Sequence, residues 1–302
     1  MPIDFFEGQR QMNTWGGRIK AYFRSSVFKR TVGSCAVLLV YIWVGRKIEN
    51  YFGVDIHIPV NDVSLFAAAL SLLMVLRTNS AYDRWWEGRK LWGALVNNCR
   101  NLAIKITAMA DVNDEEMEKA QKIITSFPFA LKEHLRKGSN QAPSELLGAP
   151  AAENVSHIPG YLSQEMFKLV RSWRESDQLK KWDHHLIDQH IVSFLDICGA
   201  CERIRNTPLP LAHRALIPQL LMLYLVVVPL GLEFTAMNVL INMAVAYFLL
   251  GLELAAEDIE EPFGHDCHDL PLDQISKNIK RSVDEIFANA HWRESTPAEP
   301  NA

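Results

Sequence analysis

An uncharged apolar stretch that ends abruptly in arginine and tryptophan is the strongest constraint on this chain. Residues 63–76 are mostly apolar and carry no charge, whereas residues 77–93 read RTNSAYDRWWEGRKLWG. Tryptophan is enriched at membrane–water interfaces, and arginine is enriched on the cytoplasmic side. An apolar window of this length also occurs in buried helices of soluble proteins. The dense Trp and Arg block after it favours a segment that leaves a membrane.

The average composition hides this pattern, because 49% hydrophobic and 22% charged residues are typical of a soluble protein. The apolar residues gather in four stretches, 31–45, 63–76, 215–234 and 236–256. Polar residues such as Gln219 and Asn242 interrupt the last two stretches, and polar groups inside spans usually face other helices or a water-filled path. No stretch has the composition of a β-strand. We therefore expect an all-α membrane protein with four transmembrane helices and a helical cytosolic region.

The distribution of basic residues predicts the topology. Residues 1–30 hold six Lys or Arg, whereas residues 215–276 hold none. Under the positive-inside rule, both termini and the long middle region lie in the cytoplasm of a multi-pass protein of the plasma (inner) membrane. No apolar core with a cleavage site begins the chain, so no signal peptide is expected. The predicted domains are an interfacial or cytosolic N-terminal helix (1–30), transmembrane helices 1 and 2 (31–76), a cytosolic helical region (77–214), transmembrane helices 3 and 4 (215–256), and a cytosolic acidic turn, short helix and tail (257–302).

Two of the five cysteines have the spacing of a redox motif. Cys198 and Cys201 are separated by two residues, but they lie within a helical pattern with no strand before it. This context favours packing over redox chemistry. The sequence also offers no nucleophile with a base and an orienting partner, and no Gly-rich phosphate loop. We therefore expect that the protein is not an enzyme. The alternative is a membrane-anchored metal- or redox-dependent enzyme, or a scaffold.

Three blocks of the sequence stand out, namely residues 77–93, the segment CERIRNTPLP (201–210), and EDIEEPFG (257–264) followed by DLPL (269–272). Together they resemble the bestrophin family, in its bacterial branch. They follow the family's order at compatible spacing, and the resemblance covers about residues 15–290. The residues that carry the family signature are Arg77, Asn79, Ser80, Tyr82, Arg84, Glu87, Arg89, Trp92, Glu202, Arg203, Pro208, Pro210, Pro262, Phe263 and Gly264.

The resemblance implies a homopentameric channel that passes monovalent ions passively through a narrow apolar neck. The family's neck positions, carried over residue by residue, fall on Ala68, Leu72 and Leu76, and its cytosolic constriction falls near Ile187. The three neck positions are spaced by four residues and share one face of a helix. A ring of leucines can gate by dewetting, although the same row could pack against a neighbouring helix. The implied partners are further copies of the chain, the lipid bilayer and ions, with no nucleic acid, and anion (chloride-type) or cation selectivity remains open.

The acidic segment after the fourth apolar stretch has several interpretations. Resemblance to animal bestrophins implies Asp258, Glu261, Asp266 and Asp269 as Ca²⁺ ligands, and such oxygen donors suit that ion. A solvated acidic turn is the alternative. A Zn²⁺ site at His265, Cys267 and His268 is a further alternative, although its ligand spacing is poor. No cofactor is required, and Arg77, Arg84 and Arg89 are expected to pair with Asp83, Glu87 or another subunit.

Overall fold

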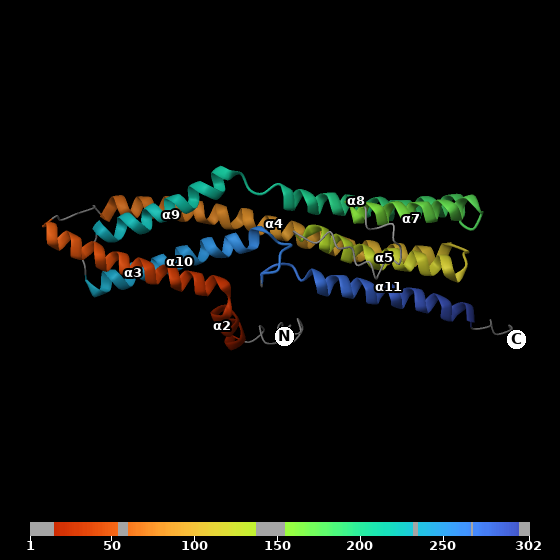
Figure 1. Ribbon diagram of the computed structural model, residues 1–302, viewed down its shortest axis with the longest axis horizontal. Coiled ribbons are helices and arrows are strands. Elements are labelled where there is room, and N and C mark those ends of the chain that lie inside the picture. The colour runs from red at the N-terminus through yellow and green to blue at the C-terminus, as the bar shows by residue number, and fades with distance from the viewer. Residues whose placement is uncertain (1–14, 54–59, 137–154, 232–234, 267, 296–302) are drawn as a thin grey trace. The chain divides into compact units, whose positions relative to one another are not determined.

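The computed structural model describes residues 15–53, 60–136, 155–231, 235–266 and 268–295. All regular structure within these ranges is helical (Figure 1). The helices are α2 (Trp15–Arg24), α3 (Ser26–Phe52), α4 (Val60–Met109), α5 (Asp114–Leu135), α7 (Ile158–Glu175), α8 (Lys181–Asn206), α9 (Leu211–Gly231), α10 (Ala236–Glu260) and α11 (Leu272–Ser295). The chain divides into two compact units, which we describe separately.

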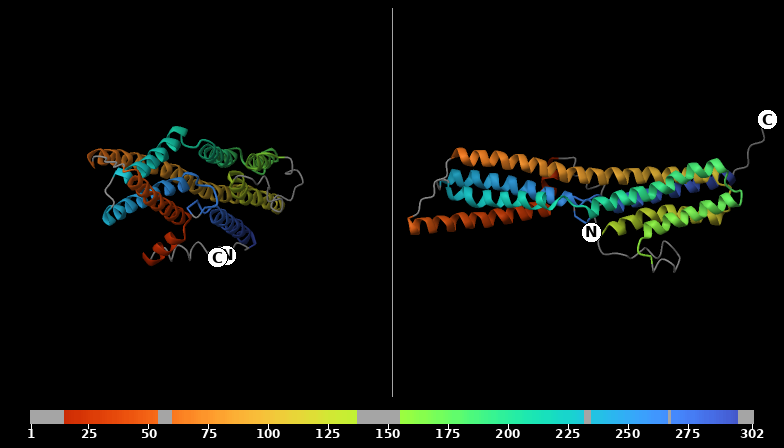
Figure 2. Two further views of the ribbon diagram at one scale, coloured as in Figure 1. Left: turned by 60° about the vertical axis from the view of Figure 1, so that its left-hand side comes forward. Right: turned by 90° about the horizontal axis from the view of Figure 1, so that it is seen from above.

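Unit 1 comprises Met1–Trp85, Pro208–Pro262 and Asp266–Asp269. In it α3, α9, α10 and the first part of α4 run side by side (Figures 1 and 2). These helices share one apolar core, formed by Leu38, Ile42, Leu70, Met74, Ile217, Leu221, Tyr224, Leu225, Val228, Ala246 and Leu249. The four helices α3, α4, α9 and α10 are each long and apolar enough to cross a membrane. The expected all-α fold with four membrane spans is therefore confirmed.

Unit 2 comprises Trp86–Thr207, Phe263–His265 and Leu270–Ala302. It contains the second part of α4 together with α5, α7, α8 and α11, and α5 packs against both α7 and α11. Large side chains fill its interior, with the rings of Phe127 and Phe194 stacked at a centroid distance of 4.3 Å and Trp92 and Trp173 fully buried. Helices α5, α7 and α8 lie within the predicted region 77–214, and α11 lies within the predicted segment 257–302.

The helix boundaries differ from the sequence prediction where polarity changes without a helix breaker. No Gly or Pro occurs between residues 63 and 87, so α4 continues through Arg77, and the predicted division at 76/77 falls inside one helix of 50 residues. The divisions at 30/31, 214/215 and 256/257 likewise fall inside α3, α9 and α10. The predicted helical region 77–214, in contrast, is not continuous, and a break within it separates α7 from α8. Polarity predicts where a helix changes environment, whereas Gly, Pro and caps decide where it ends.

Candidate functional site

The first part of α4 has one face buried within the chain and another face open. Leu70, Met74 and Ala81 lie in the core of unit 1. The row Ala68, Leu72 and Leu76 points away from that core, and Leu72 and Leu76 are 63% and 53% exposed. The hydroxyls of Ser71, Thr78 and Ser80 are satisfied within the helix, because each donates to the carbonyl oxygen four residues earlier, as Ser80 does to Leu76 at 2.9 Å. The helix thus displays an uninterrupted apolar row.

Directly after this row, Arg77 turns into the subunit and meets two carboxylates of α10. Its Nη1 lies 2.7 Å from Oε2 of Glu260, and its Nε lies 3.6 Å from Oε1 of Glu253. Arg214 of α9 approaches Glu260 at 3.3 Å from the other side. The Arg77 and Glu260 side chains are only 3% and 2% exposed. Buried ions require partners of opposite charge, and these two arginines and two glutamates form a neutral quartet that joins α4, α9 and α10.

This quartet corrects the expected pairing of the signature arginines. Arg77 pairs with Glu253 and Glu260 rather than with Asp83 or Glu87. Glu87 instead accepts a hydrogen bond of 2.6 Å from Arg203, a second signature residue. The sequence prediction named Asp83, Glu87 or another subunit, whereas Arg77 reaches two carboxylates on α10 of the same chain.

Arg84 and Trp85 hold the end of α10 and the turn after it against α4. Arg84 Nε donates to the Glu260 carbonyl oxygen at 3.1 Å. Trp85 Nε1 donates to the His268 carbonyl oxygen at 3.1 Å, and its ring stacks on that of Tyr82. Both bonds satisfy backbone carbonyls at a helix end and in a turn, where no intrahelical partner exists. Asn79 and Arg89 are exposed.

Phe263, in the Pro262–Phe263–Gly264 signature, packs its ring against Gly88 of α4. Pro262 and Phe263 are buried, and a Cβ atom placed on Gly88 would lie 3.1 Å from Phe263 Cε1. The missing side chain at Gly88 therefore provides the space for the Phe263 ring. Pro208 and Pro210 are exposed between α8 and α9, where they separate the two helices. These signature residues are structural.

The structure does not support Ile187 as a constriction residue. Its side chain is 0% exposed in the single chain, whereas a side chain that lines a lumen between copies has to be exposed in each single chain. The exposed apolar side chains of α8 are Trp182, Leu186, Val192 and Leu195. The segment before Cys201 has few sequence anchors, and the register of α8 places Ile187 on the inward face of the helix.

The four carboxylates predicted to bind Ca²⁺ do not converge on one point. Asp258 is buried and faces α3, where Ser26 Oγ donates to it at 3.3 Å and Arg30 Nη1 lies 3.7 Å away. Asp269 accepts a hydrogen bond of 2.6 Å from the Asp266 backbone N–H, and Glu261 is exposed. These contacts fit an acidic segment whose buried Asp258 packs beside Arg30 of α3. They do not form the cluster of ligands that a Ca²⁺ site needs. Of the Zn²⁺ alternative, His265 and His268 are exposed, and residue 267 lies outside the described residues.

The two cysteines of the redox-like spacing are buried on α8. Burial and the nearby Glu202 carboxylate raise the pKa of Cys198 to about 12, and burial also raises the pKa of Cys201. Reactive cysteines have lowered pKa values and access to solvent. Packing is therefore the interpretation that these thiols support.

His134 and His157 converge on Glu202, although no sequence pattern singles out the two histidines. Glu202 belongs to the family signature. The three positions are far apart in the chain and share no motif spacing, so no local signal could have grouped them. Only the packing of α5, α7 and α8 brings them together.

Comparison with known proteins places these features in a family context. Residues 8–285 match the family described as "Bacterial/Fungal Bestrophin protein". The chain is 31% identical over 280 residues to a voltage-dependent anion channel-forming protein of Nostoc, which covers 86% of this chain and 87% of that protein. A protein of the same description from Synechocystis is 28% identical over 298 residues, covering 93% and 92%. A solved bacterial bestrophin homolog from Klebsiella pneumoniae shares the fold, with a TM-score of 0.77 and 22% identity over 87% of this chain and 99% of that one.

Proposed function

This chain belongs to the bacterial and fungal bestrophin family, and on that premise we propose that it forms a membrane anion channel with a neck lined by α4. The named relatives are anion channel-forming proteins, which favours anions over the cation alternative. Five copies arranged around an axis would place the row Ala68, Leu72 and Leu76 toward the centre. Both termini would lie in the cytoplasm, as the distribution of basic residues predicts.

The observation that carries this proposal is the open apolar row of α4 immediately before the buried Arg77. A residue that lines a pore has to be exposed in one subunit, and Leu72 and Leu76 meet this condition. The neutral quartet holds the opposite face of α4 inside the subunit, which fixes the rotation of the helix. A ring of leucines excludes water when narrow and so restricts ion passage. Because the row is uncharged, the sign of the permeant ion depends on charges and helix ends elsewhere.

Chloride flux from liposomes tests the neck. Leu72→Ala shortens the side chains of one ring, so we expect flux to increase. The matched control is Leu240→Ala on α10, which removes the same atoms from a side chain that is 65% exposed and lies outside the proposed neck. Equal flux in wild type and Leu72→Ala, in protein that keeps its oligomeric size, would rule out the neck assignment.

Selectivity needs a separate measurement, because flux through a wider neck does not report the sign of the ion. In planar bilayers under a KCl gradient, the reversal potential of the wild type should lie close to the chloride equilibrium potential. A value close to the potassium equilibrium potential would contradict anion conduction and leave the neck assignment intact.

A further inference from the structure

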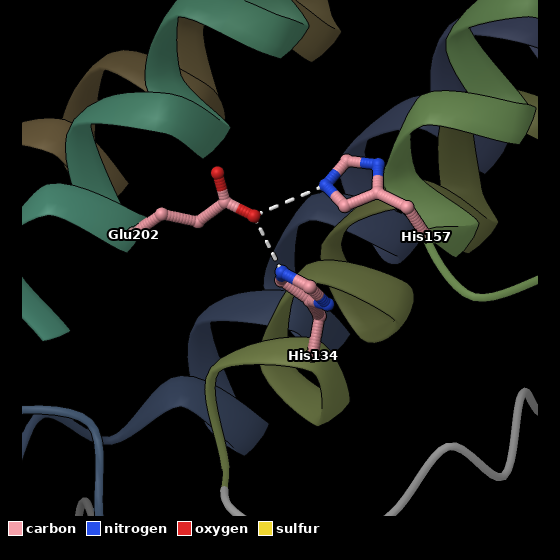
Figure 3. Close-up of side chains that lie close together, drawn as sticks. All are labelled: His134, His157 and Glu202. Atoms are coloured by element: carbon pink, nitrogen blue, oxygen red, sulfur yellow. Dashed lines mark hydrogen bonds and ion pairs between the residues drawn. The ribbon is translucent and has the colours of Figure 1, made fainter. Parts of the chain in front are cut away.

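Three donor side chains from separate helical segments meet in unit 2 (Figure 3). Glu202 of α8 lies between His134, in the last turn of α5, and His157, the N-cap residue of α7. Oε1 of Glu202 is 2.6 Å from His134 Nε2 and 3.1 Å from His157 Nε2. Within the described ranges, this is the one cluster of three or more potential metal donors.

The surrounding structure holds each donor in place. Arg205 donates to the His134 carbonyl oxygen, which ties the end of α5 to α8. The His157 ring lies over Gly160, where an added Cβ would be 2.5 Å from Nδ1. The two imidazoles meet edge to face at a centroid distance of 4.7 Å. The side chains are 22%, 39% and 31% exposed for His134, His157 and Glu202, so solvent reaches a cluster that packing has already shaped.

We propose that His134, His157 and Glu202 bind a divalent transition metal of the Zn²⁺ type, through both Nε2 atoms and the Glu202 carboxylate, with water completing the coordination. All three donor atoms lie within 4.8 Å of one another, close to the separation of ligands around one small ion. Two imidazoles and one carboxylate form a known type of three-residue zinc set. Nitrogen donors select this class of metal over Ca²⁺ or Mg²⁺, which prefer oxygen.

The His157 ring gives the site an unusual property. Its Nδ1 accepts a hydrogen bond of 2.9 Å from the Gly160 N–H, so in the metal-free state the ring proton lies on Nε2 and points to Glu202. A metal on Nε2 displaces this proton, and the neutral ring then carries its proton on Nδ1. Two N–H groups would then face each other, so the α7 cap has to open. Metal binding is therefore coupled to the first turn of α7.

Metal titration of the full-length protein in detergent, after removal of metals with a chelator, tests the site. Calorimetry with Zn²⁺ should give one ion per chain, and Zn²⁺ should raise the unfolding temperature because the assembled site binds it more tightly than the unfolded chain does. Glu202→Gln and His134→Gln should each weaken binding by at least about tenfold, as loss of a ligand or its support does. His185→Gln, at an exposed position of α8 outside the cluster, is the matched control and should bind like the wild type.

A further measurement keeps the test decisive if a ligand variant folds poorly. Hydrogen exchange at the Gly160 amide should become faster with Zn²⁺ in the wild type, because its acceptor is lost. Equal affinity in the wild type, His134→Gln and Glu202→Gln, or no binding to folded wild type, would show that the three side chains form a hydrogen-bonded network only. None of these readouts depends on ion conduction, so the result is independent of the channel proposal.

Discussion

At the scale of single residues, Arg77 makes the most consequential contact, because its charge is buried with those of Glu253 and Glu260. Removing one member of a buried ion set leaves a charge without compensation, which typically costs about 3–5 kcal/mol. We therefore expect Arg77→Met to lower the midpoint of thermal unfolding strongly. Arg89→Ala removes an exposed charge and should change stability by less than about 0.5 kcal/mol.

The double variant Arg77→Met/Glu253→Gln separates charge balance from packing. It removes one positive and one negative charge and leaves the Arg214–Glu260 ion pair in place, so the remaining set is neutral. Its unfolding midpoint should lie above that of Arg77→Met. A double variant less stable than the single one would contradict the charge-balance explanation.

Asp273 gives a prediction about pH. It lies in the first turn of α11 and accepts 2.7 Å bonds from Lys132 and Arg136 at the end of α5. Burial raises its pKa, but the bonds from the two cations outweigh this effect and lower the pKa to about 2, from an ordinary value of 3.8. The unfolded chain therefore binds the proton more tightly than the folded one. The stabilisation is complete above about pH 4 and is lost as the pH falls toward 2.

Because the Asp273 side chain is 54% exposed, its contribution is that of a surface pair, about 1 kcal/mol or less. Asp273→Asn should lower stability at neutral pH and flatten the dependence of stability on pH between about 4 and 2. Unfolding in urea at several pH values measures both effects. Asp196→Asn, at an exposed position of α8, should reproduce the wild-type pH profile.

At the scale of helices, the start of α5 shows how a helix end is fixed locally. Asn113 is the N-cap, and its side chain accepts a 2.8 Å bond from the Glu116 N–H. Three acidic residues follow in the first turn, where the helix dipole favours negative charge. Asn113→Ala should lower stability by about 1 kcal/mol and speed amide exchange in the first turn of α5, whereas Asn113→Asp should retain both. Unchanged exchange at Glu116 in Asn113→Ala would show that the cap is dispensable.

At the scale of the whole molecule, the open apolar surface of α4 predicts assembly. Leu72 and Leu76 are exposed in a single chain, and a pentamer would cover or enclose this row. Native mass spectrometry in detergent should give five subunit masses. A species of one or two subunits at all protein concentrations would contradict the pentamer and the neck.

The sequence predicted the all-α class and the four membrane spans, because hydropathy and basic residues report the environment of each helix directly. It placed Ala68, Leu72 and Leu76 on one face, because helical spacing determines which residues share a face. It failed for the partners of Arg77 and for the His134–His157–Glu202 cluster, because both depend on which distant helices pack together. It also failed for Ile187, where a shift of one position on α8 separates a buried residue from an exposed one.

The neutral quartet of Arg77, Arg214, Glu253 and Glu260 has an evolutionary consequence. Replacing Arg77 or Glu260 alone leaves an unbalanced charge in a buried site, so the first step of a change is the damaging one. Positions 77 and 260 should therefore covary among related sequences, being either both charged or both neutral. A related sequence that has lost one of these charges but kept the other should carry a new charged residue at a neighbouring position of α9 or α10.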